Sequence, residues 1–114
     1  MLTAIIGHPN AGKTTYSQQF ENVLHFDDYL GCYADGYAIA SSMQDVVIEG
    51  LFQRRKTRME LLDALSRQSP KICVWIDTPK EVCMARPNFR GRAHMEPPTL
   101  EEGWDEIIIV RGDA

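Results

Sequence analysis

A glycine-rich loop that follows directly on an apolar run is the feature that most constrains the fold of this chain. The loop reads GHPNAGKTT over residues 7–15. It fits the spacing G-x-x-x-x-G-K-[ST], in which glycines let the backbone curl so that its N–H groups point at phosphates. The apolar residues 2–6 precede the loop, and helix-compatible spacing follows over residues 13–21. Strand, loop and helix in this order are the context that phosphate binding requires.

The residue types in the loop indicate which phosphate it would hold. Lys13 is expected to bridge the β- and γ-phosphates of a nucleoside triphosphate, ATP or another. Thr14 would place its hydroxyl on a Mg²⁺ ion held between the same phosphate oxygens. The other loop residues expected to contact the nucleotide are Gly7, Pro9, Asn10, Ala11, Gly12 and Thr15.

Further short apolar runs and helical patterns alternate along the rest of the chain. The runs span residues 23–26, 46–48, 72–76 and 107–110, and their near-continuous apolarity indicates strands covered on both faces. Helices are expected over residues 13–21, 54–67 and 80–86, and residues 31–45 read as a loop with at most a short helix at 37–43. This alternation predicts an α/β fold with a five-stranded parallel sheet flanked by helices, and with the glycine loop it predicts a three-layer P-loop NTPase architecture.

Acidic residues follow several of the predicted strands. In a parallel sheet the carboxyl ends of the strands share one edge, where ligands bind. Transfer of a phosphoryl group to a hydroxyl needs a base, and Mg²⁺ needs oxygen ligands. Asp27, Asp28 and Glu49 are the candidates; if the strand continues, Asp27 and Asp28 point in opposite directions, one toward an acceptor and one toward metal. Asp77, before Thr78-Pro79, reads more readily as a residue that precedes a helix.

The basic residues are unevenly distributed. The chain has a formal net charge of −4, yet residues 52–92 hold ten of its twelve Lys and Arg. Such a region suits a phosphate-bearing substrate, and a solvated helix face over residues 54–67 is the alternative. The stretch ARPNFRGR at residues 85–92 indicates a loop that closes over phosphates, with guanidinium groups suited to bidentate contact, or else a solvated basic loop.

Composition narrows the class of protein. The 114 residues are 44% hydrophobic and 25% charged, which is typical of a single domain with one core, here residues 1–114 with a lid at about 85–95. We expect no signal peptide, because the N-terminal apolar stretch has only five residues and no basic region before it, and no membrane span, because no apolar run approaches 18 residues. Cys32, Cys73 and Cys83 lack C-x-x-C spacing, which argues against a zinc site or disulfide framework and favours a reducing, cytoplasmic setting.

Several segments together resemble a known family. Besides the glycine loop they are FDDYLG at residues 26–31, IEGLF at 48–52, ARPNFRG at 85–91 and EPPTLEEGWDEI at 96–107. With these the chain resembles, over most of its length, the P-loop kinases related to phage polynucleotide 5′-kinase. The resemblance implies phosphoryl transfer from ATP to a polynucleotide 5′-hydroxyl in the cytoplasm, that of the host if the chain is phage-encoded. A homo-oligomer is compatible with it.

The resemblance also implies roles for single residues. Asp27 takes the place of the general base on the acceptor hydroxyl, and Glu49 that of the acid on the third strand, which together with Asp28 and Thr14 would serve the metal. Arg86 and Arg90 match two lid arginines that contact phosphate. Two departures from the family pattern favour a smaller acceptor: Leu30 replaces an arginine that contacts the acceptor, and the segment between Asp28 and Val46 is short.

Three functions therefore stand at this point. The first is a polynucleotide 5′-hydroxyl kinase, and the second is a kinase for a nucleoside or another small molecule. The third is a nucleotide-binding NTPase without an acceptor, for which an acceptor base and lid arginines would be superfluous.

Overall fold

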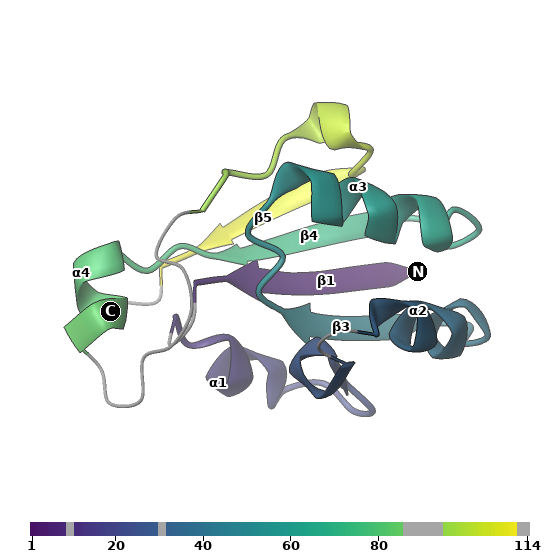
Figure 1. The fold of residues 1–114 in the computed structure, drawn as a ribbon, viewed down its shortest axis with the longest axis horizontal. Coiled ribbons are helices and arrows are strands. Elements are labelled where there is room, and N and C mark those ends of the chain that lie inside the picture. The colour runs from purple at the N-terminus through teal and green to yellow at the C-terminus, as the bar shows by residue number, and fades with distance from the viewer. Residues whose placement is uncertain (9–10, 30–31, 86–94, 112–114) are drawn as a thin grey trace.

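The computed structural model describes residues 1–8, 11–29, 32–85 and 95–111 (Figure 1). The strands are β1 (Leu2–Gly7), β2 (Leu24–His25), β3 (Val46–Gly50), β4 (Lys71–Ile76) and β5 (Glu106–Val110). The α-helices are α1 (Lys13–Ser17), α2 (Tyr33–Ser41), α3 (Arg55–Ala64) and α4 (Lys80–Ala85), and two 3₁₀ helices are η1 (Phe26–Tyr29) and η2 (Leu100–Glu102).

The five strands form one parallel sheet in the order β2-β3-β1-β4-β5, which confirms the predicted α/β class and strand count. The strand arrows in Figure 1 point left, so all carboxyl ends lie at that edge. The central strand β1 has β3 on one side and β4 on the other. Connections therefore leave the sheet centre in opposite directions, and such a switch point opens a crevice at the carboxyl edge.

Alternate side chains of the strands feed two apolar cores, one on each face. Leu2, Ala4 and Ile6 point into the larger core, which α2, α3 and Trp104 cover. Ile5 points into the smaller core together with Ala11 and with Cys83 of α4. Successive side chains of a strand point to opposite faces, and helices cover both faces of this sheet. The buried strand β1 therefore needs apolar residues at every position.

The helix predictions were partly wrong in extent. The expected helix at residues 13–21 is only the five-residue α1. The stretch predicted as a loop contains the nine-residue helix α2, which begins at Tyr33. Packing explains this helix: the rings of Tyr33 and Tyr37 both lie against Phe26, and a Cβ on Gly36 would come within 2.8 Å of that ring. The spacing of the aromatic residues and the close approach at Gly36 outweigh the local preference for a loop.

The prediction that strands are covered on both faces holds for β1 and is wrong for β5. Ile108 is 38% exposed and Ile109 is 57% exposed, although they lie on opposite faces of the sheet. In β1, by contrast, every residue is buried. Continuous apolarity thus has two meanings in this chain, burial in the centre of the sheet and exposure at its edge.

A buried ion pair ties the EPPTLEEGWD stretch to α3. Arg58 is fully buried and binds Glu102 through two bonds, Nε to Oε1 at 2.7 Å and Nη2 to Oε2 at 2.9 Å. Trp104 Nε1 donates to the same carboxylate at 3.1 Å, and Arg58 Nη1 donates to the carbonyl of Phe52 at 2.8 Å. A solvated helix face is one alternative for the basic residues 54–67. Arg58 does not lie on such a face, because it is buried against Glu102, which is 44 residues away in the sequence.

Candidate phosphate-binding site

The glycine loop connects the carboxyl end of β1 to α1, and each of its two glycines, Gly7 and Gly12, meets a steric requirement. A Cβ on Gly7 would lie 2.8 Å from the carbonyl oxygen of Ile76 at the end of β4. Gly12 has φ of +105°, in the region that other residues rarely adopt. The close approach of β4 and the left-handed turn into α1 therefore both require glycine.

Lys13 folds back over the loop. Its side chain is buried, with 5% of the residue exposed, and Nζ donates to the carbonyl oxygen of His8 at 2.6 Å. The ammonium group is thus held against the loop backbone, at the carboxyl end of the central strand. A buried ammonium in this position is the group that would meet an incoming phosphate.

Thr78 supports the loop from β4, a contact that the sequence did not reveal. Its hydroxyl donates to the carbonyl oxygen of Ala11 at 2.6 Å, and Thr78 is 1% exposed. Asp77, beside it, precedes α4 as expected, and its N–H donates to the carbonyl of Val110. The threonine therefore fixes the loop at Ala11, and no motif in the sequence indicates this role.

The residues predicted to bind the metal or the nucleotide lie in different settings. Thr14 and Thr15 are exposed in the first turn of α1. Glu49 is buried in β3, where its neighbours in the sheet are Ile5 of β1 and His25 of β2. Within the described residues no group of three His, Cys, Asp or Glu side chains could hold a metal ion by itself. Pro9 and Asn10 lie outside the part that the structure describes.

His25 joins the candidate site through Glu49. Nδ1 of His25 lies 2.7 Å from Oε2 of Glu49, and the imidazole is partly exposed while the carboxylate is buried. A neutral imidazole in this pair donates Nδ1–H to the carboxylate and keeps Nε2 as an acceptor. The only signal in the sequence is a histidine within the apolar run 23–26, which predicts a strand and no functional role for His25.

Asp27 and Asp28 follow β2 in the 3₁₀ helix η1, not in a continuing strand. The condition for their side chains to point in opposite directions, a strand that continues through both residues, is therefore not met, because β2 ends at His25. The positions of the two aspartate side chains, and of Leu30, lie outside the described part of the chain. The backbone nevertheless places both residues within three positions of His25, at the carboxyl edge.

The basic residues around α3 separate into three groups. Arg54, Arg55 and Lys56 are exposed where α3 begins, at the carboxyl edge of the sheet. Arg58 belongs to the buried ion pair described above. Arg67 is exposed beyond the end of α3, at the opposite edge. Only the first group lies on the same edge of the sheet as the glycine loop.

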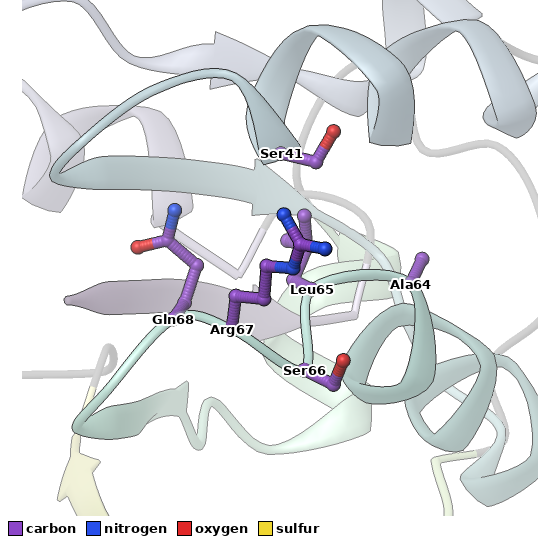
Figure 2. Close-up of a pocket in the computed structure, with 6 residues that line it drawn as sticks. All are labelled: Ser41, Ala64, Leu65, Ser66, Arg67 and Gln68. Carbon is purple, nitrogen blue, oxygen red and sulfur yellow. The ribbon is translucent and has the colours of Figure 1, made fainter.

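A pocket of about 270 Å³ lies at the amino edge of the sheet (Figure 2). Ser41 at the end of α2 lines it, as do the residues after α3, among them Ser66, Arg67 and Gln68. Gln68 makes two hydrogen bonds there. Its Oε1 accepts from the N-terminal ammonium at 3.1 Å, and its Nε2 donates to the carbonyl oxygen of Met43 at 2.6 Å. This pocket is separate from the glycine loop, which lies at the other end of the strands.

Residues 86–94 lie outside the described part of the chain, so the predicted lid and its Arg86 and Arg90 stay predictions. The residues on either side of this segment are placed. Cys83 of α4 packs in the same core as Ala11 of the glycine loop. Glu96 donates its N–H to the carbonyl of Gln53, whose side chain lies 3.4 Å from Nδ1 of His8. Both ends of the segment are therefore anchored beside the loop.

Comparison with protein-family models finds no matching family, and comparison with curated proteins finds no match. Across the residues that the structure places, none of the helices has the length and apolarity needed to cross a membrane.

Proposed function

We propose that this protein is a P-loop kinase that transfers the γ-phosphoryl group of ATP to a hydroxyl, most readily the 5′-hydroxyl of a polynucleotide. The geometry of the loop carries the proposal: Gly12 turns the chain at φ +105°, and Lys13 lies buried against the His8 carbonyl at the end of the central strand. A lysine so placed exchanges a carbonyl partner for phosphate oxygens when a nucleotide enters. The parallel sheet puts the acceptor-side residues at the same edge.

The residues fit Mg²⁺ in the manner usual for nucleotide sites, where phosphate oxygens and waters supply most ligands. Thr14 is exposed and would contribute its hydroxyl, while Glu49 and Asp28 would act from the neighbouring strand ends. Bound Mg²⁺ would neutralise charge on the β- and γ-phosphate oxygens. Lys13 contributes a second positive charge, and the loop N–H groups orient the phosphates.

On the acceptor side, Asp27 is proposed to take the proton of the attacking hydroxyl. The acceptor oxygen then bonds to the γ-phosphorus, the bond between that phosphorus and the β–γ bridging oxygen breaks, and ADP leaves. Arg86 and Arg90 are proposed to stabilise the charge that develops in transfer. The pair of His25 and Glu49 lies directly before η1 in the chain, at the same edge of the sheet.

The decisive experiment offers γ-labelled ATP to a panel of acceptors: 5′-hydroxyl DNA and RNA oligonucleotides, nucleosides and nucleotides. We expect label on the oligonucleotides and slow ATP hydrolysis without an acceptor. Label on nucleosides alone would identify the small-molecule kinase, which the short segment between Asp28 and Val46 also favours. ATP hydrolysis at the same rate with and without each acceptor, and no label on any acceptor, would support the NTPase and exclude both kinases.

Asp27→Asn should remove transfer while ATP binding stays near normal, because the amide keeps the shape of the side chain and cannot accept a proton at neutral pH. Single-turnover transfer and equilibrium nucleotide binding measure the two effects separately. Asp28→Asn is the matched control. If Asp28→Asn is the more damaging change, the roles of base and metal-associated acid must be exchanged.

Replacement of Arg54, Arg55 and Lys56 by alanine should weaken binding of a 5′-hydroxyl oligonucleotide, because these exposed cations lie at the edge where the acceptor must bind. Each phosphate contact that is lost should reduce the slope of the logarithm of the binding constant against the logarithm of the salt concentration by about one. Fluorescence anisotropy at several salt concentrations measures this slope. Arg67→Ala, at the opposite edge, is the control, and an unchanged slope in the triple variant would exclude the α3 cations from the acceptor site.

A further inference from the structure

The two edges of the sheet differ in how they are protected. At one edge β2 is only two residues long, which is a common way to keep an edge strand from pairing with another chain. At the other edge β5 has five residues, and its centre is Ile107-Ile108-Ile109. Ile108 and Ile109 are exposed on opposite faces, and no Lys or Pro interrupts the strand. A long, apolar, unprotected edge is typical of a strand that pairs with another strand.

The direction of the backbone groups shows which residues of β5 can make such pairs. The carbonyl of Val110 accepts from the N–H of Asp77, just past β4, so Val110 faces the sheet. Because backbone groups alternate along a strand, Ile108 and Glu106 face the sheet as well. Ile107 and Ile109 therefore direct their N–H and C=O groups away from β4, toward the open edge.

We propose that this edge pairs with β5 of a second copy of the chain, in antiparallel orientation, about a two-fold axis through Ile108. Ile107 then lies opposite Ile109 of the second copy, and these two residues exchange both N–H···O=C bonds. By symmetry four such bonds form. The two sheets become one continuous sheet of ten strands, and this interface is independent of any catalytic role.

The sequence of β5 is self-complementary in this register. Ile107 and Ile109 extend the face that α3 covers, and the two copies of Ile108 meet on the opposite face. Every isoleucine of β5 then lies opposite an isoleucine of the second copy, whereas Asp105 is held within its own chain by Lys71, whose N–H donates to Asp105 Oδ2 at 2.7 Å. Moving the axis to Ile107 would place Asp105 opposite Ile109, and moving it to Ile109 would place Arg111 opposite Ile107. The apolar self-complementarity of β5 therefore selects the axis at Ile108 and a second copy as the occupant.

The first test is the mass of the full chain in solution, measured by light scattering and by sedimentation over a range of concentrations. We expect a dimer for the unmodified protein and a monomer for Ile109→Lys. Leu100→Lys is the matched control, because Leu100 is 58% exposed on η2 and should tolerate lysine without loss of the dimer. Circular dichroism verifies that both variants are folded. A monomeric unmodified protein, or a dimer that survives Ile109→Lys, would overturn the proposal.

The second test reports the register and does not depend on a disruptive variant. In a Cys32→Ser background, Ile108→Cys should form an intermolecular disulfide under mild oxidation, because the two Cα atoms would be about 4.5 Å apart. Ile109→Cys should not form this disulfide. The two copies of residue 109 would be two residues apart along the paired strands, with their Cα atoms about 8 Å from each other. Crosslinking of Ile109→Cys in preference to Ile108→Cys would overturn the assigned register.

Discussion

Lys13→Ala is expected to lower the rate of phosphoryl transfer by about three orders of magnitude or more, with the fold retained. The ammonium group lies buried at the carboxyl end of the central strand, 2.6 Å from the His8 carbonyl, where it can neutralise charge between the β- and γ-phosphates. Its removal leaves the backbone turn at Gly12 in place. Steady-state transfer from labelled ATP measures the rate, and thermal unfolding verifies the fold.

Lys71→Ala is the matched control for this prediction. Lys71 is a second lysine whose Nζ donates to main-chain carbonyls, those of Ser66 and Gln68, but it lies at the amino edge of the sheet. Its removal should leave transfer unchanged. A folded Lys13→Ala variant that transfers phosphate as fast as the Lys71→Ala variant would exclude the glycine loop as the catalytic phosphate site.

Arg58→Leu should lower the free energy of unfolding by about 3–5 kcal/mol, because it leaves the buried Glu102 carboxylate without the guanidinium that binds it. Urea denaturation measures this loss. In the Arg58→Leu/Glu102→Leu double variant much of the loss should be recovered, since replacing both charges removes the unpaired one. A single variant as stable as the double variant would show that the carboxylate is solvated or neutral in the folded protein.

The same ion pair predicts a dependence of stability on pH. Burial raises the pKa of Glu102, but the bonds from Arg58 and Trp104 and the charge of Arg58 outweigh burial, so the pKa lies below its ordinary range. The unfolded chain then binds more protons than the folded protein in acid. The stabilisation is complete above the ordinary glutamate range and is lost as the pH falls through the lowered pKa. Glu102→Gln should therefore flatten the acid limb of stability measured against pH.

Local patterns in the sequence determined the central part of the fold. The apolar run at residues 2–6, the glycine loop and the alternation of strand and helix patterns predicted a five-stranded parallel sheet, and the structure has one. They also placed Lys13 and Glu49 at a single edge, because parallel strands end together. These features follow from periodicity and from turn chemistry, which act over a few residues.

Tertiary structure alone decided which distant residues meet. The pair of His25 and Glu49, the support of the loop by Thr78 and the burial of Arg58 against Glu102 each join segments at least 24 residues apart. The local sequence cannot distinguish a buried arginine from the exposed Arg54 and Arg55, since all three belong to one basic run. Burial of a charge depends on whether folding brings a carboxylate to it, and that is a property of the packed sheet and helices.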